Sequence, residues 1–91
     1  MEKTIFITGA SSGIGRSTAK LFQKRGWNVI ATMRTPEKES ELKELANTFV
    51  TKLDVLELDS IKSAIREGIQ AFGKIDVVLN NAGYGLMGTF E

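Results

Sequence analysis

The sequence contains no cysteine and no histidine among its 91 residues, and only one proline and one tyrosine. These absences exclude disulfides, thiolate chemistry, Zn sites built on Cys or His, and every Ser-His-Asp or Cys-His arrangement. We therefore predict no metal site. Twelve basic residues against eleven acidic ones leave a charge of +1, which gives no electrostatic reason to expect nucleic acid or membrane lipid as a partner. The remaining chemistry is that of backbone amides, hydroxyls, carboxylates, lysine, arginine or a bound cofactor.

Long hydrophobic runs are also missing. The first apolar segment, Ile5-Phe6-Ile7, is too short for the core of a signal peptide. No run approaches the roughly 18–20 residues that span a bilayer. The chain is therefore expected to be soluble and cytoplasmic. Its length suffices for one small domain, and a hydrophobic content of 42% is ordinary for a globular protein.

Short apolar segments alternate with stretches of helical periodicity. Strands are predicted at 4–8, 28–33, 48–53 and 75–79, and helices at 13–25, 35–46 and 59–72. Thr35 is expected to cap the second helix, with Pro36 in its first position, and Asp59 to cap the third. The inward stripe of the third helix would comprise Leu58, Ile61, Ile65, Ile69 and Phe72. This alternation predicts an α/β fold, a Rossmann-type open parallel sheet with strand order 3-2-1-4 and helices on both faces.

A glycine-rich turn, Thr8-Gly9-Ala10-Ser11-Ser12-Gly13-Ile14-Gly15, joins the first strand to the first helix. Glycine allows the sharp reversal and lets a phosphate approach the bare backbone. The unpaired amides at the start of the following helix, with its dipole, favour an anion. Because the turn lies inside a strand–helix–strand unit, it predicts a phosphate site. A Walker motif does not fit, since Ile14-Gly15-Arg16 stands where Gly-Lys-Ser/Thr would be required.

This turn resembles the Thr-Gly-Xaa-Xaa-Xaa-Gly-Xaa-Gly motif of the short-chain dehydrogenase/reductase family, matched at Thr8, Gly9, Gly13 and Gly15. Further features agree in order and spacing across the whole chain: Arg34, then Asp54-Val55, then Asn80-Asn81-Ala82-Gly83. The resemblance implies that residues 1–91 are the N-terminal part of one dinucleotide-binding domain. The cofactor residues expected from the turn and the resemblance are Gly9, Ser11, Ser12, Gly13, Ile14, Gly15, Arg34, Asp54, Val55, Asn80, Ala82 and Gly83.

Arg34 indicates the choice of cofactor. A dinucleotide site for NAD expects Asp or Glu about 20 residues past the glycines, whereas this chain has Met33 and Arg34. A guanidinium binds a 2′-phosphate through paired, charge-assisted hydrogen bonds. The predicted cofactor is therefore NADP. Many NADP-preferring relatives carry a basic residue in the glycine turn, where this chain has Ser12, so Arg34 would have to discriminate largely alone.

The family resemblance also implies roles beyond the phosphates. Asp54 would receive the adenine amino group and Val55 would pack on the ring, although Asp54 could instead cap the local turn. Asn80 would be the contact nearest the cofactor ribose. These residues follow the third and fourth strands, at the edge where open α/β sheets bind ligands.

The family's catalytic pair, a tyrosine with lysine four residues later, does not occur in these residues. The only tyrosine is Tyr84, and Gly88 stands four residues after it. We therefore expect a fragment, with no catalytic residue of its own. The parent would be an NADP(H)-dependent oxidoreductase that interconverts a small carbonyl and an alcohol, and it could be a homo-oligomer. The alternatives are a catalytically silent dinucleotide-binding or sensor module, or an α/β scaffold that binds nothing.

Overall fold

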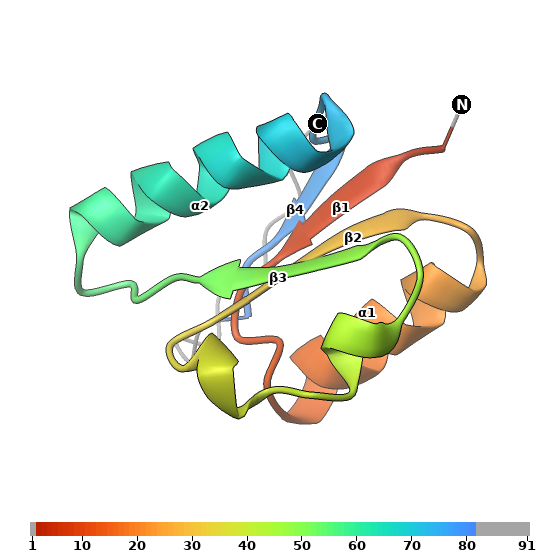
Figure 1. Cartoon of the computed structure of the whole chain (residues 1–91), viewed down its shortest axis with the longest axis horizontal. Coiled ribbons are helices and arrows are strands. Elements are labelled where there is room, and N and C mark those ends of the chain that lie inside the picture. The colour runs from red at the N-terminus through yellow and green to blue at the C-terminus, as the bar shows by residue number, and fades with distance from the viewer. Residues whose placement is uncertain (1, 82–91) are drawn as a thin grey trace.

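The computed structural model describes residues 2–81. These residues form, in chain order, β1 (Thr4–Ile7), α1 (Gly13–Lys24), β2 (Asn28–Met33), the 3-10 segments η1 (Pro36–Lys38) and η2 (Leu42–Glu44), β3 (Thr48–Lys52), α2 (Leu58–Phe72) and β4 (Val77–Leu79). The strands are parallel and lie in the order β3-β2-β1-β4, which confirms the predicted topology (Figure 1).

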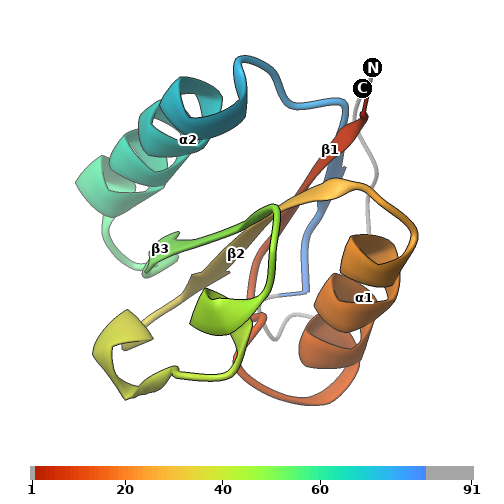
Figure 2. The same ribbon diagram turned by 45° about the vertical axis from the view of Figure 1, so that its right-hand side comes forward.

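Alternate residues of each strand enter two separate apolar clusters. Ile5 and Ile7 of β1 pack on the side of α1, together with Val29 and Ala31 of β2. Phe6 and Ile30 point the opposite way and pack beneath α2. The two helices therefore lie on opposite faces of one sheet (Figure 2). This is the period of two that a strand buried on both sides requires.

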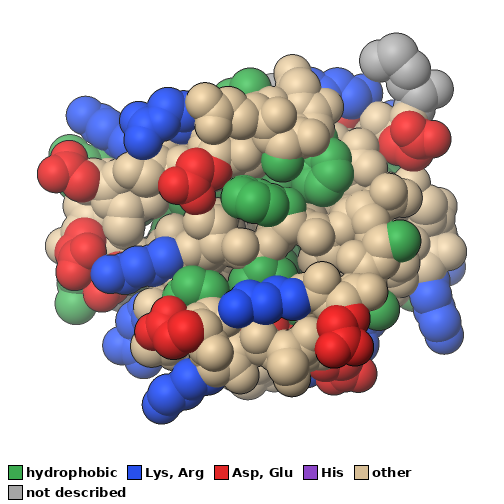
Figure 3. All heavy atoms as spheres, viewed as in Figure 1, with side chains coloured by type: hydrophobic (Ala, Val, Ile, Leu, Met, Phe, Trp, Pro, Cys, Tyr) green, Lys and Arg blue, Asp and Glu red, His purple; other side chains and the backbone are tan. Residues whose placement is uncertain are grey.

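The surface carries charges of both signs around its rim. In the view of Figure 3, Lys and Arg side chains are interspersed with Asp and Glu, and hydrophobic side chains show between α2 and β3. Between residues 2 and 81 no helix has both the length and the apolar character needed to cross a membrane.

The segment between β2 and β3 differs from the prediction. We expected one helix over 35–46, but the chain forms only η1 and η2, separated by Glu39–Glu41. Thr35 and Pro36 do take the capping and first positions of η1, without a side-chain capping bond. Leu42 is buried, and Leu45 is half-buried against the same cluster. The helix is interrupted because Glu39 is extended and its carboxylate turns inward to other partners.

The start of α2 was also predicted wrongly. Glu57 occupies the N-cap position, and Asp59 lies in the first turn. Ser60 makes the local contacts instead, because its hydroxyl donates to carbonyl oxygens of Asp54 and Glu57. Gly73 ends the helix in the left-handed conformation. Of the expected stripe, Leu58, Ile65 and Ile69 are more than a third exposed, so only part of it is buried.

Candidate nucleotide-binding site

A cavity of about 630 Å³ opens at the carboxyl edge of the sheet. It lies where the chain leaves β1, β2, β3 and β4, the place at which open α/β sheets bind ligands. Its lining residues are Gly9, Ser11, Ser12, Gly13, Ile14, Met33, Arg34, Leu53, Asp54, Val55, Leu56 and Asn81. Eight of the twelve predicted cofactor residues therefore surround one cavity.

The glycine turn forms one wall of this cavity. Its position is fixed by backbone hydrogen bonds from Thr8 N to the Leu79 carbonyl, 3.0 Å, and from Ala10 N to the Thr32 carbonyl, 2.9 Å. Gly13 has φ +60°, and no atom lies within 4 Å of the point where its Cβ would be. The backbone at the start of α1 is therefore exposed to whatever enters the cavity.

Gly15 has a different part in the same turn. It is buried and does not line the cavity. A Cβ there would overlap the carbonyl oxygen of Gly9 and lie 2.8 Å from Nδ2 of Asn81. Gly15 therefore lets α1 pack directly on the turn and on the end of β4, and its contribution to a bound ligand would be indirect.

The amino ends of the two helices differ in charge. α1 has no acidic residue in its first turn, and its N-cap residue, Ser12, makes no side-chain capping bond. α2 has Glu57 as its N-cap residue and carries Asp59 in its first turn. An acidic side chain satisfies the positive end of a helix, so α1 is the helix whose amino end is suited to an external anion.

Two arginines lie near this end of the sheet, and they differ in whether carboxylates contact them. Arg16 of α1 contacts the carboxylates of Glu39 and Glu41 at 2.6 Å each. These two contacts, that of Glu39 first, raise the pKa of Arg16. Arg34 follows β2, is exposed and lines the cavity. Within residues 2–81 Arg34 forms no ion pair, so its charge faces the cavity without a carboxylate partner.

Asp54 and Val55 both line the cavity, half-buried, just past β3. Oδ1 of Asp54 accepts a hydrogen bond from the backbone N–H of Leu56 at 3.0 Å. This is the local turn contact that the sequence left open as an alternative to adenine recognition. The contact orients the carboxylate at the cavity wall. A contact of Asp54 with adenine stays a prediction.

Asn80 and Asn81 point to different sides. Oδ1 of Asn80 accepts a hydrogen bond from the Thr8 hydroxyl at 2.9 Å, and Asn80 lines a second cavity beside α2. Asn81 lines the first cavity, and its backbone N–H donates to the Thr8 oxygen at 2.7 Å. Ala82 and Gly83, also predicted to contact the cofactor, lie outside the described residues.

Asn81 is the polar lining residue that the sequence reasoning missed. Side chains alternate along a strand, and Leu79 belongs to the cluster on the α1 side. Two residues later, Asn81 returns to that side, where α1 begins. The alternation could have identified it. Met33, Leu53 and Leu56 were missed as well, because nothing in an apolar residue marks it as lining a site.

The described residues contain no group of three or more acidic, His or Cys side chains that could hold a metal ion. The fold and the cavity together define an open α/β domain whose cavity lies beside the acid-free amino end of α1, at the carboxyl edge of the sheet.

Comparison with known proteins identifies the family. Residues 3–91 match the short chain dehydrogenases. An uncharacterized oxidoreductase of Schizosaccharomyces pombe is 41% identical over 92 residues, covering 97% of this chain and 30% of that protein. A short-chain dehydrogenase from Streptomyces avermitilis has a TM-score of 0.82 at 33% identity, covering 91% of this chain and 31% of that one. The chain belongs to the short-chain dehydrogenase family, and its fold is of the Rossmann type, as predicted.

Two related structures contain nicotinamide cofactors. A 3-ketoacyl-(acyl-carrier-protein) reductase from Brucella melitensis, complexed with NADH, has a TM-score of 0.77 and 28% identity, covering 84% of this chain and 32% of that one. ElxO with NADP bound has a TM-score of 0.80 and 35% identity, covering 94% and 37%. The chain thus spans about a third of the length of these proteins, and both NADH and NADP occur among them.

Proposed function

We propose that this chain is the cofactor-binding part of an NADP(H)-dependent oxidoreductase that interconverts a small carbonyl and an alcohol. The observation that supports it is one cavity with two complementary features, the acid-free start of α1 on one wall and an unpaired Arg34 on another. A diphosphate and a 2′-phosphate are the two anionic groups of NADP. The nicotinamide, when bound, would exchange a hydride with the substrate.

The proposal assigns roles to the predicted residues. Backbone groups of Gly9, Ser11, Ser12, Gly13 and Ile14 would hold the diphosphate, with Gly15 supporting the turn. Arg34 would bind the 2′-phosphate. Asp54 and Val55 would contact adenine, and Asn80, Ala82 and Gly83 would border the ribose. The whole protein would be cytoplasmic, and a homo-oligomer is compatible with the proposal.

Titration of NADPH and NADH into the protein tests the cofactor. Arg34→Ala should weaken NADPH binding by about 1.5–3 kcal/mol, because a charge-assisted contact is lost, and should barely change NADH binding. Lys38→Ala is the matched control. Lys38 is exposed, lies four residues along the same loop and does not line the cavity. Equal losses for both nucleotides in Arg34→Ala would contradict the choice of NADP.

A second candidate is a dinucleotide-binding or sensor module without catalysis. It applies to these 91 residues on their own, which contain no Tyr-x-x-x-Lys pair. Loss of NADPH absorbance that depends on an added carbonyl compound, in a protein of the relatives' length that carries this chain, separates the two. NADPH binding without such turnover of any of a broad panel of aldehydes and ketones would favour the module.

A further inference from the structure

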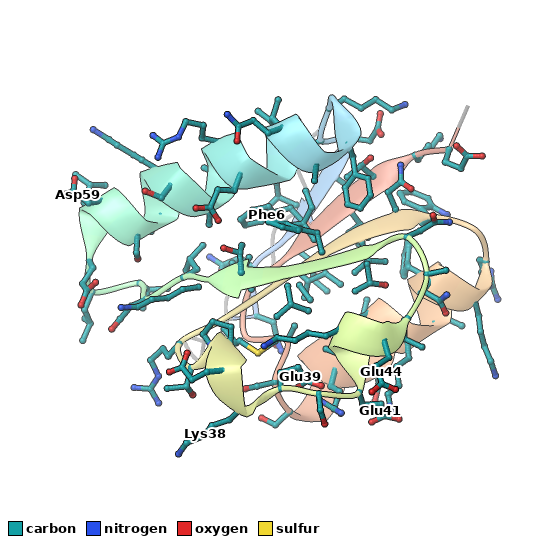
Figure 4. The ribbon with its side chains drawn as sticks, viewed as in Figure 1. Phe6, Lys38, Glu39, Glu41, Glu44 and Asp59 are labelled. Atoms are coloured by element: carbon teal, nitrogen blue, oxygen red, sulfur yellow. The ribbon has the colours of Figure 1, made fainter. Side chains whose placement is uncertain are left out.

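A cluster of charged side chains links α1 to the segment that follows Arg34. Arg16 extends from the first part of α1, and its two terminal nitrogens each contact a different carboxylate at 2.6 Å: Nη1 that of Glu39 and Nη2 that of Glu41. Lys20, one turn further along α1, contacts the second oxygen of Glu41 at 2.9 Å. Figure 4 shows Glu39 and Glu41 lying over α1, whereas Lys38, the last residue of η1, points away from it.

Glu39 is the buried member of this cluster. Its side chain is 6% exposed, against 56% for Glu41. Its second oxygen accepts the backbone N–H of Leu42 at 2.8 Å, and Leu42 is fully buried. Both carboxylate oxygens are therefore used, one toward α1 and one toward η2. The contact with Arg16 lowers the pKa of Glu39, which is charged at neutral pH.

The backbone carries this anchorage to Arg34. Glu39 N donates to the Pro36 carbonyl at 3.0 Å, and Lys38 N donates to the Thr35 carbonyl at 3.1 Å. Thr35 is the residue directly after Arg34. Fixing Glu39 on α1 thus fixes the turn of η1, and the turn of η1 fixes the backbone from which the Arg34 side chain extends.

We infer that Glu39, held by Arg16, is a positioning residue that sets the distance between Arg34 and the amino end of α1. The inference rests on the proposed function. In NADP the diphosphate and the 2′-phosphate are separated by a fixed covalent frame. A guanidinium forms paired hydrogen bonds with a phosphate only in a narrow geometry, so the protein must hold its two anion-binding groups at a matching separation. NADH lacks the 2′-phosphate, so its affinity would not depend on this separation.

The test compares Glu39→Gln with Glu41→Gln. Each variant removes one negative charge from the same segment and one carboxylate partner of Arg16. Glu39→Gln should weaken NADPH binding about 3- to 10-fold and leave NADH binding unchanged. The Glu41 side chain is exposed, and among residues 2–81 its carboxylate bonds to Arg16 and Lys20 but to no backbone amide, so Glu41→Gln should change either affinity by less than about 2-fold. Arg16→Lys, whose single ammonium cannot fork between two carboxylates, should resemble Glu39→Gln.

A double variant separates this inference from the proposed function. If Glu39 acts through Arg34, Glu39→Gln should have no further effect on the ratio of NADPH to NADH affinity once Arg34 is alanine. Suppose that Arg34→Ala changes the ratio of NADPH to NADH affinity but that Glu39→Gln and Arg16→Lys do not. That result would overturn the inference and leave the proposed function standing. So would equal losses of NADPH and NADH in both variants, which would mark a general structural role. A ratio unchanged in Arg34→Ala would overturn the proposed cofactor choice, and the inference with it.

Discussion

The two faces of the sheet are packed to different degrees. On the α1 face, Ile5, Ile7 and Leu42 are at most 2% exposed, and α1 and η2 cover them. On the α2 face, an apolar cavity of about 420 Å³ lies beside the helix, and Ile65 and Ile69 that line it are 40% and 44% exposed. Within residues 2–81, one face is a closed core and the other is covered only in part.

The strand order explains this difference. The connections from β1 to β2 and from β2 to β3 run in one direction across the sheet, whereas α2 leads from β3 back to β4. When every crossover is right-handed, a connection that runs in the opposite direction across the sheet lies on the opposite face. Of the connections that residues 2–81 contain, the first face therefore receives two and the second receives one. The same reversal makes β4 a neighbour of β1, and the candidate site lies at the carboxyl edge of these strands.

The largest expected effect is a truncation in the closed core. Leu42→Ala should lower the free energy of unfolding by about 2–5 kcal/mol, because it removes a fully buried side chain and leaves a void. Urea unfolding followed by circular dichroism measures the loss. Leu42 also lies beside the Glu39 anchor, so the variant should weaken NADPH binding as well.

Ile65→Ala is the control on the open face. This side chain is 40% exposed and borders the cavity beside α2. Its truncation should cost less than about 1.5 kcal/mol, since much of its surface already contacts water. A cost equal to that of Leu42→Ala would show that the two faces are equally closed.

The next effect concerns the turn that joins the closed face to the site. Gly15→Ala places a methyl group against the backbone of Gly9, which cannot move without opening the turn. We expect a loss of about 1–3 kcal/mol in stability. NADPH and NADH should both bind more weakly and to a similar extent, because the diphosphate is common to them. A variant that keeps its affinity for both would show that the turn tolerates the displacement.

The sequence predicted those features that local chemistry determines. The strand segments followed from apolar runs, and the order 3-2-1-4 followed from the alternation of strands and helices with right-handed crossovers. The glycine turn, Arg34 and Asp54 line one cavity, and their contact with a cofactor stays a prediction. All of these residues directly follow strands, and the carboxyl ends of parallel strands meet at one edge.

The errors arose where tertiary contacts decide. Over 35–46 the leucine spacing is compatible with a helix, but Glu39 bonds to Arg16, 23 residues earlier in the chain. No local pattern shows that partner. Likewise Asp59 is a good capping residue by type, yet Ser60 reaches back to Asp54, and this places the helix start at Leu58. The exposure of Ile65 and Ile69 depends on the covering of a whole face, which the stripe alone does not reveal.

Acid should loosen the α1 face through Glu39. The contact with Arg16 holds the pKa of Glu39 below its usual value, about 4.3. Its contribution to stability is therefore present above that value and is lost as the pH falls through the lower, folded-state pKa. Glu39→Gln lacks this contribution at every pH, so it should be less stable than the native chain at pH 6, and the difference should narrow as the pH falls toward the lowered pKa of Glu39.

Urea unfolding at pH 6, 4 and 3 measures that difference. The group faces Arg16 from α1 and Glu41 from its own segment, and it accepts the Leu42 amide. The pKa of Asp76 is also lowered, chiefly by the backbone N–H of Thr4. Asp76 titrates in both proteins, so the difference between them reports on Glu39. A constant difference across this range would mean that the charge of Glu39 does not contribute to stability.

The smallest effect is expected for the glycine of the open face. Gly68 lies in α2 against Ile30, and a Cβ there would meet Cδ1 of Ile30 at 2.6 Å. That atom is the far end of a flexible side chain, whereas the obstacle at Gly15 is backbone. Gly68→Ala also gains helix propensity of about 1 kcal/mol, which offsets most of the crowding. The variant should therefore unfold within about 1 kcal/mol of the native chain in urea and bind NADPH normally. A loss of stability larger than that of Gly15→Ala would mean that α2 packs more tightly on the sheet than α1 packs on the turn. That result would reverse the difference between the two faces.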